Sequence, residues 1–316
     1  MNAMLQPESS PSAVDTLATA AIAAATATAA AANAATAAPQ RRPRRAMAVS
    51  TTAIVRQQAS ALAMKIIAPL LGAALLVLVW QIITIKNSSF PTPLATLHEA
   101  VTLFSDPFYR NSPNDQGIGW NILASLQRVA LGFGLAALVG IPLGFLIGRV
   151  PFVSSMVGPM ISLLKPVSPL AWLPIGLLVF KSANPAAIWS IFICSIWPMI
   201  INTAVGVQRV PQDYMNVARV LNLSEWKVLT KILLPSALPY ILTGVRLSIG
   251  TAWLVIVAAE MLTGGVGIGF WVWDEWNNLN VPHIIIAIVA IGVVGLLLEQ
   301  ALVALARAFS YEQVAS

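Results

Sequence analysis

Charged side chains are scarce in this sequence. The 18 Lys and Arg and the 12 Asp and Glu make up only 9% of its 316 residues, against about 25% in an ordinary soluble domain. A soluble globule needs charge to cover its surface, so this composition excludes a soluble enzyme. The net charge of +6 comes from few acids and scattered bases. There is no basic face with interleaved aromatic residues, which excludes a nucleic-acid-binding protein.

Residues that carry redox, metal or nucleotide chemistry are also rare. Cys194 is the single cysteine and lies in an apolar run, which excludes a disulfide framework and a cysteine-based metal site. His98 and His283 lie far apart, and the sequence contains no H-E-x-x-H and no G-x4-G-K-[ST]. We therefore predict that this chain is not itself an enzyme, has no catalytic residues, and binds no metal and no cofactor.

The sequence does contain long runs of hydrophobic residues. Hydrophobic residues make up 58%, the mean hydropathy is +0.79, and several apolar runs reach the roughly 20 residues that a bilayer requires. The fold class expected is therefore all-α, a polytopic membrane protein with six transmembrane helices. The predicted spans are Ile66–Ile85, Asn121–Gly148, Gly158–Phe180, Ala186–Gly206, Ala237–Leu262 and Ile284–Ala306.

The first sixty residues differ from the rest. They are rich in Ala and Thr and contain an arginine cluster at residues 41–45. Alanine is nearly neutral toward lipid, and the positive charges follow the alanine run, whereas a secretory signal has them first. We predict a disordered or weakly helical cytoplasmic tail over residues 1–60 and a transmembrane domain over residues 61–316.

The basic residues set the orientation of the spans. Six spans place both termini on one side, and with the tail in the cytoplasm the cytoplasmic segments hold 12 of the 18 bases, against three in outer segments and three inside spans. By the positive-inside rule, both termini are expected to be cytoplasmic.

Small residues and prolines interrupt two of the predicted spans. A small residue recurs at every fourth position of the second span, which makes a flat stripe for packing within the chain or, alternatively, for a subunit or pathway face. The stripe consists of Gly132, Ala136, Gly140, Gly144 and Gly148. Pro166, Pro169 and Pro174 break the third span, so it is expected to be buried in protein or to line a cavity. The glycines at 264–269 predict a flexible outer turn before an amphipathic, tryptophan-rich helix.

The longest internal cytoplasmic segment covers residues 207–235. Pro211 favours a helix start, and Asn222 tolerates the left-handed conformation that ends a helix. Ser224 can cap a second helix, and Pro235 is expected to stop that helix before the fifth span. The segment therefore predicts two short helices joined by a tight turn, a rigid piece that a soluble partner could push.

This segment resembles the E-A-A-x3-G-x9-I-x-L-P loop of ABC-importer permeases. Asn216 replaces the glutamate of that pattern, so a glutamate-specific salt bridge is absent, while Asn222 replaces the glycine and still permits a positive φ. The loop residues expected to couple to an ATPase are Asp213, Asn216, Val217, Ala218, Asn222, Ile232, Leu234 and Pro235.

Other strings place the resemblance in one branch of that family. The segments at 121–128 (NILASLQR), 170–174 (LAWLP) and 243–253 (TGVRLSIGTAW) are similar to the nitrate, sulfonate and taurine permeases. The segment at 258–280 is most similar to the nitrate and bicarbonate permeases of cyanobacteria. The resemblance covers roughly residues 66–312.

The resemblance implies a type I ABC-importer permease core with a cytoplasmic coupling-helix loop, in a bacterial inner membrane. Two copies would form the pathway as a homodimer. Two cytoplasmic ATPase subunits would bind the ATP and engage the loop. A periplasmic or lipid-anchored solute-binding protein would deliver the anion to the outer face. Nitrate, with nitrite, is the first substrate expected, bicarbonate the second, and aliphatic sulfonates such as taurine the third.

Ionisable residues inside spans are candidates for the pathway, since each costs about 3 kcal/mol in lipid and normally faces protein or water. Arg128, Lys165 and Arg246 could lend positive potential to an anion pathway, and Lys165, beside Pro166, is the first candidate. The alternative is that Arg246 and the buried Glu260 belong to structural polar networks. A competing class, a stand-alone anion transporter or channel, would need matched internal repeats, and the sequence shows none.

Overall fold

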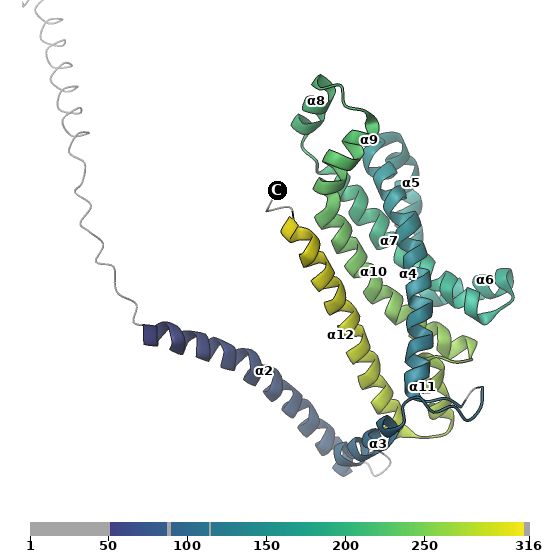
Figure 1. Ribbon diagram of the computed structural model, residues 1–316. Helices are drawn as coiled ribbons and strands as arrows, with labels where there is room; N and C mark the ends of the chain where they lie inside the picture. Colours follow the sequence, from purple (N-terminus) through teal and green to yellow (C-terminus); the bar gives the residue numbers. More distant parts are fainter. Residues whose placement is uncertain (1–50, 87–89, 114, 313–316) are drawn as a thin grey trace, which may run out of the picture. The chain divides into compact units, whose positions relative to one another are not determined.

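The computed structural model describes residues 51–86, 90–113 and 115–312, and the elements in these ranges are helical (Figure 1). Contacts divide the chain into two units, residues 1–71 and 72–316. The predicted tail lies mostly outside the described residues, and its last ten residues belong to the first helix described.

The helices begin and end as follows. They are α2 (Thr51–Lys86), α3 (Pro93–Ser105), α4 (Ile118–Arg149), α5 (Pro151–Leu164), α6 (Pro169–Phe180), α7 (Ala183–Gln208), α8 (Gln212–Val220), α9 (Glu225–Val228), a π-helical turn η1 (Leu229–Leu233), α10 (Leu234–Thr263), α11 (Ile268–Asn277) and α12 (Val281–Glu312).

Five helical stretches in the described residues are long and apolar enough to cross a membrane, and the number is six if the bent pair α5 and α6 counts as one span. The five continuous stretches are Ile67–Ile85, Ile118–Arg149, Ala183–Gln208, Glu225–Thr263 and Val281–Arg307. The predicted third span, Gly158–Phe180, is not one straight helix. It is divided between α5 and α6, which are bent by 100° at the proline-containing link between them. Pro166 lies in the link and Pro169 begins α6, so these two prolines account for the break, since proline removes a helical donor and clashes with the preceding turn. Pro174 lies inside α6.

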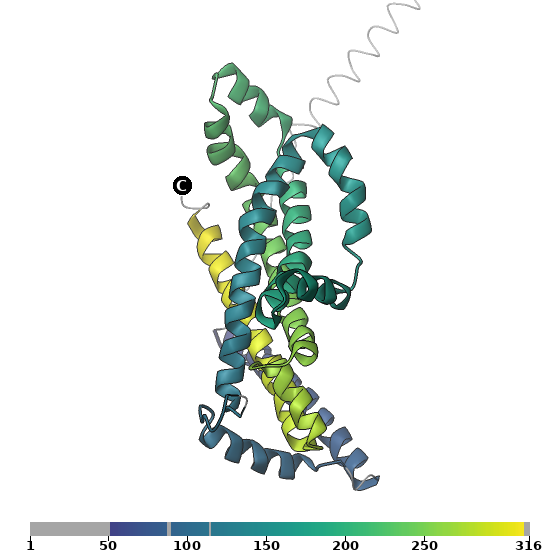
Figure 2. The same cartoon turned by 90° about the vertical axis from the view of Figure 1, so that its right-hand side faces the viewer.

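The small-residue stripe of α4 packs against α7. This is the first of the two predicted uses of the stripe, packing within the chain. A Cβ atom built on Gly132 would lie 2.7 Å from Cβ of Ile191, and one on Gly144 would lie 2.5 Å from Cβ of Thr203. The stripe therefore permits a close helix approach within the chain. Figure 2 shows α4 and α7 running side by side.

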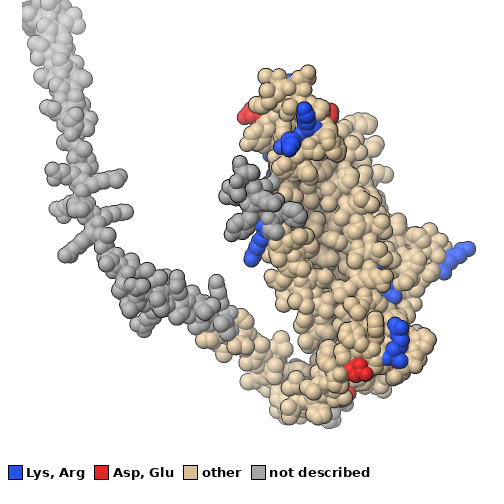
Figure 3. Space-filling view, in the orientation of Figure 1, with Lys and Arg blue, Asp and Glu red and all other residues tan. Residues whose placement is uncertain are grey.

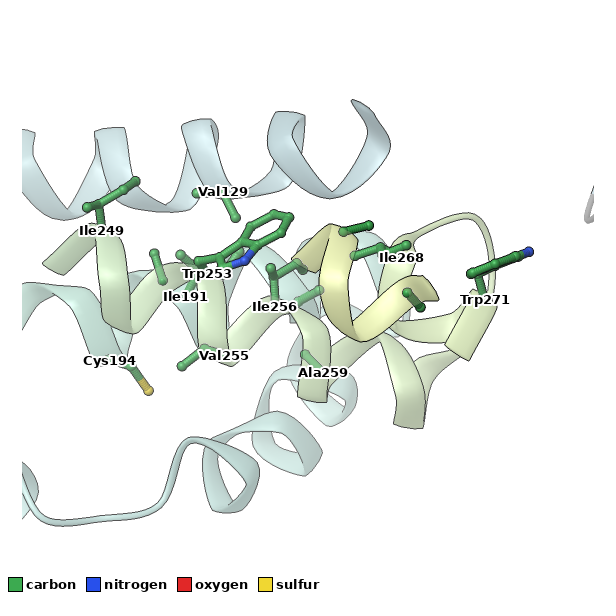
Figure 4. Close-up of a cluster of buried hydrophobic side chains, with 14 of the residues drawn as sticks. Val129, Ile191, Cys194, Ile249, Trp253, Val255, Ile256, Ala259, Ile268 and Trp271 are labelled. Carbon is green, nitrogen blue, oxygen red and sulfur yellow. The ribbon is translucent and has the colours of Figure 1, made fainter. Parts of the chain in front are cut away.

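The main apolar core lies where α4, α7 and α10 meet α11 and α12 (Figure 4). Val129 of α4, Ile191 of α7 and Ile256 of α10 are almost fully buried there. Trp253 is also buried, and its indole N–H donates to the Ile291 carbonyl at 3.0 Å. This bond ties α10 to α12 and satisfies the one polar atom of a large apolar side chain.

One boundary in the loop between α7 and α10 was predicted wrongly. Pro235 does not end a helix before the fifth span, because α9, η1 and α10 run on as one apolar stretch, Glu225–Thr263. Pro235 falls in the first turn of α10, directly after the wide turn η1. A π-type turn changes the helical register, and the first turn of a helix tolerates proline.

Candidate functional site

A buried carboxylate forms the centre of a polar network between α4, α10 and α11. Glu260 of α10 is only 1% exposed. Its carboxylate accepts hydrogen bonds from the Ser125 hydroxyl at 2.8 Å and from the Gly269 N–H at 3.0 Å. It also pairs with Nη1 of Arg128 at 2.5 Å. A buried charge is tolerable only when it is paired and hydrogen-bonded, and Glu260 meets both conditions.

The same network fixes the glycine turn between α10 and α11. The Gly267 N–H donates to Oδ1 of Asn121 at 2.9 Å, and the Ile268 N–H donates to the Ser125 hydroxyl at 3.0 Å. A Cβ on Gly269 would lie 2.1 Å from the Val257 carbonyl oxygen. In place of the flexible turn expected from its glycines, the structure has a turn held by α4, and glycine is needed for close approach.

Arg128 links this network to the amino end of α7. Its Nη1 also donates to the Val266 carbonyl at 2.6 Å, and its Nε donates to Oδ1 of Asn184. A cavity of about 270 Å3 lies here, lined by Arg128, residues 182–184, Ala187 and residues 263–265. Ser182, at the N-cap of α7, makes no side-chain capping bond. The first N–H groups of a helix and its positive dipole end favour a small anion.

Arg246 belongs to a different ion pair. Its Nε donates to Oε1 of Glu299 on α12 at 3.0 Å, so it does not share a network with Glu260. The side chains of Arg246 and Glu299 are 55% and 44% exposed within spanning helices. They line a groove of about 540 Å3 between α10 and α12. Since charges in a span face protein or water, this surface is not one that faces lipid alone.

Lys165 lies at the bend between α5 and α6. It is the C-cap residue of α5 and is exposed. Among the residues the structure describes, no ion pair joins it to an acid. Its role in the pathway stays a prediction.

The loop between α7 and α10 has the first helix, α8, and the tight turn that the sequence predicts, whereas its second helix, α9, continues into η1 and α10. Asn222 adopts φ of 49° after α8, the left-handed conformation expected at a helix end. The Leu223 N–H donates to the Ala218 carbonyl at 3.0 Å, which closes the turn. Ser224 occupies the N-cap of α9 without a side-chain capping bond.

The loop is seated on the rest of the chain by its apolar inner face. Ala218 is 3% exposed and packs in a cluster with Val207 of α7, Val228 of α9 and Leu233 of η1. Ile232 packs against the same cluster. Arg149, at the end of α4, pairs with Glu225 of α9. These contacts fix the loop on the ends of α4, α7 and α10.

The outer face of the loop is exposed and largely apolar. Of the predicted coupling residues, Asp213, Asn216, Val217, Asn222, Leu234 and Pro235 are exposed. Oδ1 of Asn216 accepts a hydrogen bond of 3.5 Å from Nη1 of Arg219 on the same helix. Large apolar side chains are exposed beside them, namely Tyr214, Val217, Val220, Leu221 and Trp226. Several large exposed apolar side chains on one short loop are typical of a protein-binding surface.

Two polar clusters were not anticipated from the sequence. The first consists of Asn121 and Ser125, which belong to the Glu260 network. Their spacing could have indicated it, since Asn121, Ser125 and Arg128 are three or four residues apart and therefore share one face of a helix. At the opposite end of the bundle from α8, Nε2 of His283 lies 3.2 Å from Oε1 of Glu99. Its Nδ1 lies 3.1 Å from Oε1 of Glu275, without hydrogen-bond geometry. No local pattern joins these three residues.

Comparison with known proteins fits this architecture. The model of the family described as "Binding-protein-dependent transport system inner membrane component" matches residues 140–311. The chain belongs to this family. The inward-facing MetNI methionine ABC transporter has the same fold, with a TM-score of 0.54 and 15% identity over 60% of this chain and 94% of that one.

Relatives with higher identity fall in one branch of the family. The chain is 50% identical over 237 residues to the nitrate import permease protein NrtB of Synechocystis sp., covering 75% of this chain and 86% of that protein. It is 46% identical over 239 residues to the bicarbonate transport system permease protein CmpB of Synechococcus elongatus, covering 74% and 86%. The predicted family and branch are confirmed.

The family assignment fixes the general role of the chain. It is an inner-membrane component of an ABC transporter, with the all-α permease fold and several apolar helices. Such a system depends on a binding protein, as the family description states. The competing class, a stand-alone transporter or channel, does not fit this family.

Proposed function

We propose that the chain is the permease subunit of an ATP-driven importer that carries nitrate, with nitrite, across the inner membrane. The observation that carries this proposal is the identity of 50% and 52% with two nitrate import permeases over 237 and 221 residues. Bicarbonate is the second candidate, because bicarbonate permeases share 46–47% identity over the same part of the chain. Aliphatic sulfonates are the third.

The geometry beside Arg128 supports a small oxyanion as the substrate class. The guanidinium group and the uncapped amino end of α7 both favour negative charge, and the cavity between them is small. Glu260 neutralises part of the positive charge, which keeps an anion from being held too tightly to leave. Arg128 is therefore the first pathway residue in this proposal.

The pathway itself is proposed to lie between two copies of the chain. Arg246 and Glu299 are exposed in spanning helices, and an aqueous or protein-covered environment is the one that tolerates them. A second copy placed against the α10 and α12 groove provides it. In this arrangement Arg246 lines the route, and Lys165 at the α5–α6 bend lies in the broken span. A Lys165→Ala protein that transports at the normal rate would remove Lys165 from the pathway.

The remaining partners are assigned to the two ends of the helix bundle. Two cytoplasmic ATPase subunits, which bind the ATP, are proposed to dock on the exposed apolar face of α8 and α9. The solute-binding protein is proposed to dock at the opposite end, near Asp274, Glu275 and the tryptophans of α11. Both chain termini are then cytoplasmic. Figure 3 shows charged side chains at both ends of the bundle and a few basic ones at its sides, on an otherwise uncharged surface.

The test is the ligand dependence of ATP hydrolysis by the assembled complex. The chain, its co-purified ATPases and its binding protein are reconstituted in liposomes, and hydrolysis is measured with nitrate, nitrite, bicarbonate or taurine. The proposal expects nitrate and nitrite to stimulate hydrolysis several-fold. Stimulation by bicarbonate or taurine alone would show that one of these anions, and not nitrate, is the substrate, while the chain would still be an ATP-driven importer. Failure of any ATPase to co-purify would overturn the importer assignment for this chain.

A further inference from the structure

A histidine connects three helices at the end of the bundle opposite α8 (Figure 1). His283 stands in the first turn of α12, and its side chain is 16% exposed. Its Nε2 lies 3.2 Å from Oε1 of Glu99 on α3, and its Nδ1 lies 3.1 Å from Oε1 of Glu275 on α11. The imidazole ring therefore stands between two carboxylates that come from two different helices.

The doubly protonated ring is the form that suits both carboxylates. A neutral imidazole carries one N–H, so its other nitrogen would present a lone pair to one of the two acids. The imidazolium has an N–H on each nitrogen and a positive charge that attracts both acids. The contact with Glu275 lacks hydrogen-bond geometry, so it depends on the charge of the ring and not on a directed bond.

An aromatic neighbour favours the same charged form. The indole ring of Trp271 on α11 stacks on the imidazole of His283, with the two ring centroids 5.6 Å apart and the planes inclined by 22°. A cation within about 6 Å of an indole face is attracted to the electron-rich ring. Three side chains from α3 and α11 thus favour a positive charge on this one residue of α12.

His283 is the group of this cluster that titrates near neutral pH, because histidine is the side chain whose ordinary pKa lies between pH 5 and 8. The facing acids are Glu99 on α3 and Glu275 on α11, and no other charged side chain that the structure describes pairs with the ring. Tyr109, on the link between α3 and α4, interacts electrostatically with Glu275. Burial and the nearby Asp115 raise the pKa of Tyr109 above 10, so it stays neutral in this range.

We propose that His283, Glu99 and Glu275 form a pH-sensitive clasp that holds α3 on the helix bundle. In the protonated state the ring attracts the acids of α3 and α11 together. As the pH rises, the ring loses its proton and one N–H, and the pair with Glu99 weakens. Ala100 and Leu103 of α3 pack against the apolar core, a contact that does not change with pH. Raising the pH is therefore expected to loosen α3 without unfolding the protein.

The experiment follows the motion of α3 with a spin label in the full chain, purified with its ATPases and placed in lipid nanodiscs. A nitroxide is attached at Val101→Cys, an exposed position of α3. Its mobility is measured by electron paramagnetic resonance at about pH 6 and about pH 9, on either side of the usual histidine range. Cys194 is buried, so it contributes little background. The proposal expects the mobile fraction of the spectrum to double at the higher pH.

Two histidine variants separate the clasp from a general effect of pH. His283→Gln removes the titrating ring, so the label on α3 should be equally mobile at both pH values. His98→Gln is the matched control, because His98 is the other histidine of the chain and lies exposed on α3. It should respond to pH as the wild type does. A wild type without a response, or a His283→Gln protein with the wild-type response, would overturn the proposal.

Two acid variants test whether the charge of Glu99 holds α3. At the lower pH, Glu99→Gln should raise the mobility of the α3 label to the level of His283→Gln. Asp106→Asn, at the exposed C-cap of α3, should leave it unchanged. An equal change in both variants, or the same pH response from a label at Val220→Cys on α8, would overturn the proposal. None of these measurements requires nitrate, so their outcome does not depend on the proposed substrate.

Discussion

Arg128 and Glu260 show at the scale of single residues how charge is kept inside a membrane protein. The two residues are far apart in sequence, yet they form an ion pair that the Ser125 hydroxyl and the Gly269 N–H complete. Breaking a buried pair by removing one partner typically costs about 3–5 kcal/mol, because the other charge is left unpaired. The pair is therefore expected to be important for stability as well as for the pathway.

We predict that Arg128→Met lowers the free energy of unfolding by about 3–5 kcal/mol, since Glu260 would remain buried without its cation. Adding Glu260→Gln to that variant should recover most of the loss, because the amide removes the orphaned charge. Denaturant unfolding of the protein in lipid nanodiscs measures both. An Arg128→Met protein as stable as the wild type, or a double variant no better than the single one, would contradict this account.

The sequence identified the costly charges but not their partners. An ionisable residue in an apolar run is visible without a structure, which is why Arg128, Arg246 and Glu260 were candidates. Pairing depends on which helices meet, and no local pattern shows that Arg246 joins Glu299 and Arg128 joins Glu260.

At the scale of elements, the close contact of α4 with α7 rests on glycine. A Cβ on Gly144 would meet Thr203 at 2.5 Å, whereas one on Gly134 of the same helix would meet nothing within 4 Å. Gly144 therefore tests the contact with α7, and Gly134, which has free space beside it, is the control on the same helix.

Gly144→Ala is expected to destabilise the protein by roughly 1–3 kcal/mol, since the added methyl group overpacks the interface. Gly134→Ala should be neutral or stabilising by up to about 1 kcal/mol, because alanine favours the helix where there is room. Thermal unfolding of the two variants in the same detergent compares them. Equal losses in both would show that α4 and α7 do not meet along this stripe.

The loop between α7 and α10 has a buried inner face and an exposed outer face, on which we propose that the ATPases dock. The neighbouring residues Ala218 and Val217 belong to the inner and the outer face respectively. Ala218→Glu would place a carboxylate in the apolar cluster beneath α8, so we expect lower thermal stability together with loss of transport. Val217→Glu changes the exposed face. It should leave stability within about 0.5 kcal/mol of the wild type and reduce ATPase co-purification. If Val217→Glu binds the ATPases normally, α8 is not the docking element.

Local turn chemistry was the most predictable part of this loop. The helix start after Pro211 and the left-handed Asn222 followed from residue type alone. The role of Pro235 did not, because the π-helical turn before it depends on how α9 packs against the cluster of Val228 and Leu233. The prolines predict that the helix breaks between α5 and α6, but they do not predict the angle of 100° between the two helices.

At the scale of the whole molecule, the fold was predictable because a membrane permits few solutions. Apolar runs of the required length must be helices, since the bilayer satisfies no backbone hydrogen bonds. The branch-specific strings then indicated the family. The contacts among α3, α11 and α12, including His283 with Glu99 and Glu275, could not be inferred from the order of the spans.

The orientation of the chain is tested by labelling from outside the cell. In intact cells, a membrane-impermeant maleimide should label Asn111→Cys, in the exposed link between α3 and α4. It should reach Val220→Cys on α8 only after permeabilisation. Cys194 is buried, so it contributes little background. Labelling in the reverse order would place the coupling loop outside and contradict the proposed ATPase contact.

The most direct test of the central claim is the movement of nitrate itself. Labelled nitrate uptake is measured in liposomes that hold this chain, its ATPases and its binding protein, with and without ATP. We predict saturable uptake that requires both ATP and the binding protein and that excess unlabelled nitrite reduces. ATP hydrolysis that proceeds while no nitrate enters the liposomes would contradict the claim that this chain is a nitrate permease.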